Sequence, residues 1–282
     1  GDINGDGKVD VIVGGSQTLV WYRNPDWVSN TIATGARYGE GSHVDAEDLN
    51  GDGRLDVISG ESLGPTNRTM WFEQTVSGWV PHVLSSAEFC HDLHFHDVDG
   101  DARDDAVCLN QRAPRVVWMQ APADPTTEWP SQLIEANRGA MGLELVDLDQ
   151  DGRTDVVAGR AWYRNTGASP WPRYPYTTLT SPYGGFNDYA MVSVLDLDGQ
   201  GPLDIFATLF AETPEGKAYA FLAPTDLFTG SWTAVQVDTE PLFGVHSQRE
   251  ANFDGTGRPQ IMIGESNFGG WDFGPNLDPE IF

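Results

Sequence analysis

The chain has 282 residues and a formal net charge of −26 at neutral pH, from 42 acidic and 16 basic residues. A surface this acidic repels nucleic acids and anionic membranes, so we expect neither as a partner. The 39% of hydrophobic residues and the ten tryptophans nevertheless indicate a packed globule. No apolar run approaches the roughly 18 residues that a membrane span requires, which predicts no membrane insertion.

One short stretch with Asp or Asn at alternate positions recurs along the chain. "DINGDGKVDV" begins at Asp2, "DLNGDGRLDV" at Asp48 and "DVDGDARDDA" at Asp97. Further copies begin at Asp147 and Asp196, and a degenerate copy begins at Asn252. Successive copies start 46 to 56 residues apart, a period typical of propellers and repeat arrays.

Each repeat also contains short runs rich in Val, Ile, Tyr, Phe and Trp, bounded by Gly, Pro, Asn and Asp. Such runs predict strands, and no apolar period of 3.6 residues predicts a long helix. Four antiparallel strands in a unit of this length are typical of a propeller blade, with the aromatic residues packed between neighbouring blades. The sequence therefore predicts an all-β fold, a single β-propeller domain over residues 1–282. Its six blades span approximately 1–35, 36–85, 86–135, 136–180, 181–240 and 241–282.

The two end blades are expected to be incomplete. The chain begins inside an aspartate loop, and it stops at "PEIF", where the third strand of the sixth blade is expected. A closed ring would need further strands there. We therefore expect the parent gene to continue beyond one or both ends, which leaves a ring of six or of seven blades open.

The aspartate loops have the chemistry of a calcium site. Side-chain oxygens at positions 1, 3 and 5, a carbonyl at position 7 and a glycine at position 6 match the first part of an EF-hand loop. The usual Glu at position 12 is missing, and an Asp at position 9 is expected to complete the shell. The side-chain ligands expected are Asp2, Asn4, Asp6, Asp10, Asp48, Asn50, Asp52, Asp56, Asp97, Asp99, Asp101, Asp105, Asp147, Asp149, Asp151, Asp155, Asp196, Asp198 and Asp204. The carbonyl ligands expected are those of Lys8, Arg54, Arg103, Arg153 and Pro202.

The copies are not equal. Ala102 replaces the glycine of the third loop, at a cost of about 1–2 kcal/mol for a left-handed residue. Gln200 replaces the fifth-position Asp of the fifth loop and weakens it, whereas the sixth copy retains only Asp254 as a charged ligand. We expect four or five structural calcium ions. The alternative, acidic turns without a metal, would leave carboxylates that repel one another and raise their own pKa values.

This pattern resembles the FG-GAP or VCBS repeats of integrin-like β-propellers, and the resemblance covers nearly the whole chain. Weak calcium sites of this kind are filled at millimolar calcium outside the cell, so we expect an extracellular protein. The two cysteines do not strengthen the expectation of an extracellular protein. If His96 pairs with Ala106, Cys108 faces His94 and Cys90 lies about four residues, or ~13 Å, further along. Bridged Cα atoms lie within about 7 Å, so a disulfide requires another register.

Antiparallel topology places the loops that enter the first strands at the end opposite the calcium loops, where binding and catalysis usually reside. His43, His91 and His246 lie five or six residues before their calcium loops. The candidate catalytic residues of this face are His91, His43, Tyr38 and Arg138, and the candidate ligand-binding residues are His246, Tyr183, Tyr189, Asn187 and Arg112. Capping of strand ends is the alternative role for any single histidine. His94, nearer its calcium loop, is expected to be structural.

Two classes of function remain open. Propellers built on similar repeats include polysaccharide lyases and lectins, and a lyase would hold a uronate carboxylate against Arg138. His91 and His43 would then transfer protons, with Tyr38 as the partner acid. The integrin-like resemblance instead implies a non-enzymatic adhesion or assembly module with a protein partner. We expect a polysaccharide or glycan as the ligand, because the histidines gather on the loops of the binding face.

Overall fold

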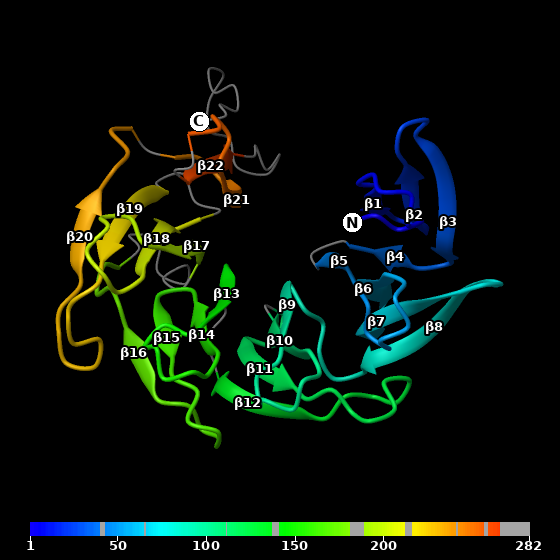
Figure 1. Cartoon of the computed structure of the whole chain (residues 1–282), viewed down its shortest axis with the longest axis horizontal. Coiled ribbons are helices and arrows are strands. Elements are labelled where there is room, and N and C mark those ends of the chain that lie inside the picture. The colour runs from blue at the N-terminus through cyan, green and yellow to red at the C-terminus, as the bar shows by residue number, and fades with distance from the viewer. Residues whose placement is uncertain are drawn as a thin grey trace. The chain divides into compact units, whose positions relative to one another are not determined.

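A computed structural model of the chain describes residues 1–39, 43–64, 66–110, 112–136, 141–180, 189–211, 216–240, 242–256 and 259–265. All regular elements in these ranges are β-strands (Figure 1). The chain divides into two compact units, residues 1–137 and 138–282. The all-β prediction is confirmed for the described residues.

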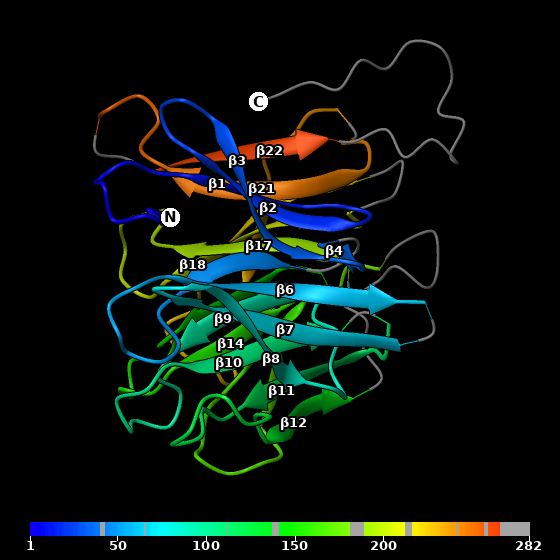
Figure 2. The same ribbon diagram turned by 90° about the vertical axis from the view of Figure 1, so that its right-hand side faces the viewer.

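The first unit contains three antiparallel sheets. The first has three strands in the described residues: β1 (Val11–Gly14), β2 (Thr18–Arg23) and β3 (Val28–Thr34). The second contains β4 (Arg37–Tyr38), β5 (Val44–Glu47), β6 (Asp56–Leu63), β7 (Thr66–Thr75) and β8 (Gly78–Ser85), and Figure 2 shows β6, β7 and β8 side by side. The third contains β9 (Asp92–His96), β10 (Asp105–Asn110), β11 (Arg115–Met119) and β12 (Ser131–Ala136).

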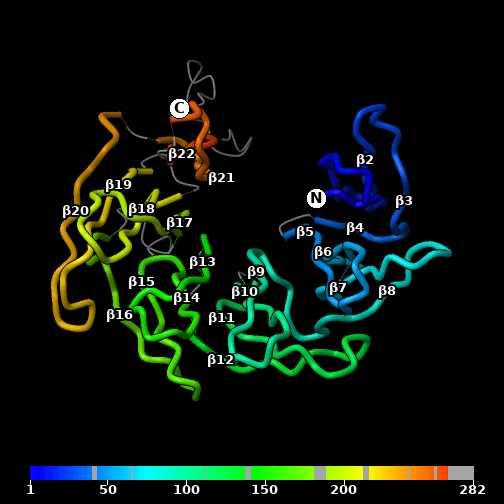
Figure 3. The backbone as a smooth tube through the Cα atoms, viewed as in Figure 1, coloured from blue at the N-terminus to red at the C-terminus, as the bar shows by residue number. Residues whose placement is uncertain are grey.

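The second unit repeats this plan. Its first sheet contains β13 (Leu143–Val146), β14 (Asp155–Ala158), β15 (Ala161–Tyr163) and β16 (Arg173–Pro175). The next contains β17 (Ala190–Leu195), β18 (Asp204–Leu209), β19 (Lys217–Leu222) and β20 (Thr233–Gln236), which follow one another in chain order (Figure 3). In the described residues the last repeat forms a two-stranded sheet of β21 (Val245–Ala251) and β22 (Gln260–Glu265).

The core lies between successive sheets, as the aromatic pattern predicts. In the first unit the indole of Trp71 on β7 is fully buried in a cluster with Leu93 and Met119 of the next sheet. In the second unit Trp162 on β15 is fully buried with Phe221 of β19. Burial of one large aromatic side chain removes on the order of 150–250 Å² from water, so these rings dominate the contact between neighbouring sheets.

The first strand of the second repeat is interrupted, which corrects one expectation. Arg37 and Tyr38 are strand residues, paired with Ser62 and Glu61 of β6, and are not part of an entering loop. The strand resumes as β5, where Val44 pairs with Ser59 of the same neighbour. Both segments therefore lie along one edge of β6, because β6 is long enough to pair with each in turn.

The expected separation of the two cysteines is wrong. Cys90 and Cys108 form a disulfide, with Cα atoms 5.3 Å apart. The register is shifted by one residue, so that Cys108 faces Leu93. The strand also begins only at Asp92, after a bend at His91. Before the bend, the Thr69 hydroxyl donates to the Glu88 carbonyl at 2.9 Å and accepts from the Cys90 amide at 3.3 Å. The assumption of an extended chain as far as Cys90 therefore fails.

Candidate functional site

The aspartate loops share one pattern of hydrogen bonds. In the fourth loop the Asp147 carboxylate accepts from the Asp151 amide at 3.0 Å and from the Gly152 amide at 2.9 Å. The Asp149 carboxylate accepts from the same Asp151 amide at 3.1 Å. The loops that begin at Asp2, Asp48 and Asp97 repeat these contacts. The spacing of the aspartates thus folds the backbone into the same tight turn four times.

Position 6 of these loops is left-handed, as the calcium-loop pattern predicts. Gly7, Gly53 and Gly152 have φ angles of 84°, 85° and 86°, and Ala102 adopts φ 68° in the third loop. The fifth loop departs from this turn, since its position 6, Gly201, has a φ angle of 134°. The unequal copies predicted from the sequence are therefore visible in the backbone.

The aspartate at position 9 connects each loop to the end of the second strand that follows the loop, which is β2, β7, β11, β15 or β19. In the fourth repeat the fully buried Asp155 accepts from the Leu148 amide through Oδ2 at 3.2 Å and from the Asn165 amide through Oδ1 at 2.8 Å. Asp10, Asp56, Asp105 and Asp204 make the corresponding pair of contacts. In the sixth copy Gln260 takes part of this role, accepting from the Phe253 amide at 2.7 Å. We call this double contact the aspartate staple.

Three of the loops gather carboxylates closely enough to share a cation. Carboxylate oxygens lie within 4.8 Å of one another in three groups: Asp97, Asp99 and Asp101; Asp147, Asp149 and Asp155; and Asp196, Asp198 and Asp204. Two oxygens bound to one calcium at 2.3–2.6 Å can be at most about 5 Å apart, so this spacing fits the ion. The donors are all oxygen, which suits a hard cation. The carbonyl ligands expected at position 7, from Lys8 to Pro202, stay predictions.

Burial raises the pKa of three position-9 carboxylates, those of Asp56, Asp105 and Asp155. Desolvation and the charge of Asp149 together raise the pKa of Asp155 to about 7, against the two backbone hydrogen bonds. Desolvation likewise raises the pKa of Asp56 to about 6, with Asp52 and Asp48 adding to the rise. Carboxylates that lie this close together repel one another, which raises their pKa values when no cation is bound. A bound cation would lower these pKa values again.

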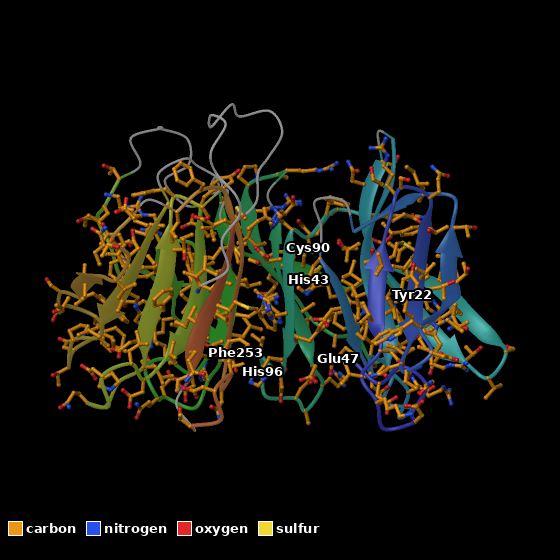
Figure 4. The ribbon with its side chains drawn as sticks, turned by 90° about the horizontal axis from the view of Figure 1, so that it is seen from above. Tyr22, His43, Glu47, Cys90, His96 and Phe253 are labelled. Atoms are coloured by element: carbon orange, nitrogen blue, oxygen red, sulfur yellow. A yellow bond between two sulfur atoms is a disulfide. The ribbon has the colours of Figure 1, made fainter. Side chains whose placement is uncertain are left out.

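In the first unit two candidate histidines lie at the other end of the strands from the loops. Figure 4 shows Cys90 and His43 toward one end, and Glu47 and His96, the last residues of β5 and β9, toward the other. The His43 amide donates to the Cys90 carbonyl at 3.1 Å, and the His91 amide donates to the Leu109 carbonyl at 2.8 Å. Backbone contacts thus bring the segments of His43 and His91 together, as the topology predicts.

Each of these histidines has a carboxylate partner that the sequence interpretation missed. His43 Nε2 lies 3.3 Å from Asp45 Oδ2, and His91 Nδ1 lies 3.3 Å from Asp92 Oδ2. Burial raises the pKa of Asp45, but the contact with His43 and the nearby charges bring it below its usual value. The His43 ring also lies 5.8 Å from that of His94. An Asp two residues after His43 on the same strand face was the available signal.

The other candidates are scattered. Tyr38 is only 3% exposed, its hydroxyl lies 3.2 Å from the Thr34 carbonyl, and burial together with Glu61 raises its pKa to about 12. That placement gives no support to Tyr38 as a proton donor. The exposed guanidinium of Arg112 lies 4.4 Å from the centre of the Phe89 ring. In the second unit, His246 is exposed on β21, and Tyr189 forms a parallel bridge with Met141. Arg138, Tyr183 and Asn187 lie outside the described residues.

Known proteins resemble this chain in its repeats and in its fold. A sequence model of the FG-GAP-like repeat matches residues 2–59 and 97–158. Among solved structures, the biofilm matrix protein Bap1 of V. cholerae resembles the chain in fold, with a TM-score of 0.53 at 20% sequence identity. The match covers 90% of this chain and 40% of the Bap1 chain. No curated protein matches the sequence. The two matched stretches of the chain are therefore FG-GAP-like repeats.

Proposed function

We propose that this chain is an extracellular, adhesion-like module stabilised by calcium. The observation that carries the proposal is the loop geometry, in which aspartate oxygens are held by the same backbone turn in four successive repeats. The Cys90–Cys108 disulfide supports an oxidising compartment. The described part of the chain contains no helix of the length and apolarity that would span a bilayer. The likeness in fold to a matrix protein agrees with this role.

Calcium would be held by the side chains at positions 1, 3, 5 and 9 of the loops that begin at Asp2, Asp48, Asp97 and Asp147, and more weakly at Asp196. The ion would neutralise carboxylates that otherwise repel one another, and so stabilise each sheet where its first two strands meet. Elemental analysis after gel filtration in dilute calcium tests this. We expect at least three calcium ions per chain and a lower melting temperature in chelator, and fewer than three ions would contradict the proposal.

The sheets are the blades of a β-propeller in this proposal. The first strands of successive sheets approach closely in the second unit, where Met141 and Tyr189 bridge in parallel. Gly142 has φ 78° there, and a Cβ on it would lie 2.3 Å from the Ala190 carbonyl oxygen. Small-angle scattering distinguishes a ring from an extended array. A compact domain of this length has a radius of gyration of about 19 Å, and a much larger value would exclude a closed ring.

A glycan is the ligand that we propose for the His43–His91 end of the first unit. Paired imidazole and carboxylate groups at partly buried positions offer donors and acceptors for sugar hydroxyls. A matrix polysaccharide would suit an adhesion module. Cleavage is the weaker alternative, because Tyr38 is buried.

Glycan binding and glycan cleavage are distinguished with a panel of uronate-containing and neutral polysaccharides. Binding is measured for each, and absorbance near 235 nm detects the new double bonds that cleavage by a lyase would form. His91→Ala should weaken binding without unfolding the protein, whereas Asp52→Ala should lower the melting temperature and its calcium dependence but leave the affinity of the folded protein nearly unchanged. If His91→Ala unfolds the protein while binding per folded molecule is unaltered, the histidines are structural. Tight binding to a protein with no glycan binding would favour an assembly module.

A further inference from the structure

In three repeats, the residue directly before the staple donor at the end of the third strand contacts the aspartate loop of its own repeat. In the second repeat, Glu73 accepts from the Asn50 side chain at 3.3 Å. In the third, the Gln120 amide donates to Asp99. In the fourth, the Arg164 guanidinium donates to Asp149. All three partners occupy loop position 3, so one site on the third strand faces one expected calcium ligand in three successive repeats.

The chemistry of this contact follows the loop residue. Where position 3 is Asn50, the partner Glu73 is an acceptor. Where position 3 is a carboxylate, the partner is a donor. Only the fourth repeat of these three supplies a full positive charge, through Arg164.

Arg164 is fixed in place by the staple of its own repeat. The next residue, Asn165, donates its amide to Asp155 at 2.8 Å, which holds the end of β15 against the loop. The guanidinium then contacts Asp151 at 3.0 Å in addition to Asp149, whose side chain is only 4% exposed. A single tethered cation therefore neutralises positions 3 and 5 together.

The corresponding charge in the third loop is of another kind. Arg103 contacts Asp101 alone, belongs to the loop itself and has a side chain that is 49% exposed. An exposed ion pair of this kind contributes little. The neutral Gln120, which directly follows β11, is the residue that contacts Asp99 of the third loop.

We propose that Arg164 is a built-in counter-ion of the fourth loop, which lowers its calcium affinity below that of the third loop and keeps it folded when calcium is scarce. This rests on the proposed function, that the loops bind calcium. Calcium must take oxygens that the guanidinium now contacts, and the positive charge beside it repels the ion. One unit charge about 5 Å from a divalent ion, in a dielectric close to that of water, changes affinity on the order of tenfold.

A reciprocal exchange in the full chain tests the proposal. Arg164→Gln gives the fourth loop the residue of the third, and Gln120→Arg does the converse. Calcium titration by calorimetry, with bound calcium counted by elemental analysis, should show one site tightened about tenfold by Arg164→Gln and one site weakened by Gln120→Arg. In chelator, Arg164→Gln should melt at a lower temperature than the wild type, and its stabilisation by calcium should be larger.

Two further variants make the result specific. Arg164→Lys keeps the charge and should leave the affinity within a few-fold of the wild type. Arg23→Gln changes the equivalent residue of the first repeat, which pairs with Asp26, and should leave calcium binding unchanged. If both exchange variants bind calcium at full occupancy with unaltered affinities, the inference about Arg164 is wrong, whereas the proposed calcium binding still holds. Absence of bound calcium from every variant and from the wild type would overturn the proposed function and the inference with it. If Arg164→Gln does not fold, the calcium affinity of Gln120→Arg tests the inference by itself, and an unaltered affinity would overturn it.

Discussion

Removal of the Asp155 carboxylate should destabilise the protein whether or not calcium is present. Asp155 is fully buried and accepts two backbone amides, from Leu148 at 3.2 Å and from Asn165 at 2.8 Å. Both partner residues are themselves buried. Asp155→Ala would leave these two amides without their acceptor, at about 1–3 kcal/mol each. The expected loss is therefore roughly 2–6 kcal/mol, a large share of the 5–15 kcal/mol that stabilises a typical domain.

Urea unfolding in chelator, followed by tryptophan fluorescence, isolates this loss from any contribution of the metal. Asp155→Asn retains one acceptor oxygen and should lose about half as much. Asp151→Ala is the matched control: that side chain is 27% exposed, so its loss should change mainly the calcium dependence. If Asp155→Ala unfolds in chelator at the same urea concentration as the wild type, the staple contributes nothing and the reasoning from its two hydrogen bonds is refuted.

Three further predictions concern other features. Cys108→Ser should cost about 3 kcal/mol, because the disulfide closes an 18-residue separation, and reductant should lower the melting temperature of the wild type but not of the variant. Tyr38 has a pKa raised above its unfolded value of about 10, so its contribution to stability is intact below pH 10 and is lost as the pH rises toward 12. Melting temperatures between pH 9 and 12 should therefore fall less steeply for Tyr38→Phe, and equal slopes would contradict the raised pKa. Ala102→Gly should stabilise the third loop by up to about 1 kcal/mol, because Ala102 has φ 68°, and a destabilised variant in thermal melts would show that the loop carries no strain.

Local patterns predicted the repeat and its loops well, because their physical causes lie within about ten consecutive residues. Alternating oxygens at positions 1, 3 and 5 fold the turn onto its own amides, as the contacts of Asp147 show. The need for a left-handed residue at position 6 is equally local, and it identified Ala102 as the exception. The short aromatic runs predicted the four-stranded sheets of the third, fourth and fifth repeats and the burial of Trp71 and Trp162 between sheets.

The aspartate staple was only half visible from the sequence. Its position in the loop was evident, and it was interpreted as a calcium ligand alone. The second contact, from Asp155 to Asn165, spans ten residues and depends on how β15 ends beside the loop. The ion pairs of Arg164 depend on the same approach, and the loop spacing contains no sign of them.

Contacts between residues far apart in the sequence, even within one repeat, were beyond any local pattern. A shift of one residue in the pairing of β9 with β10, together with a bend before Asp92, brings Cys90 to Cys108. The same kind of long-range packing buries Tyr38 against Glu61, where the sequence suggested an exposed loop. The sequence alone therefore determined which turns and strands form, since those follow from neighbouring residues. Only the tertiary structure decided register, burial and partners, because these depend on residues that are distant along the chain and meet when the sheets pack.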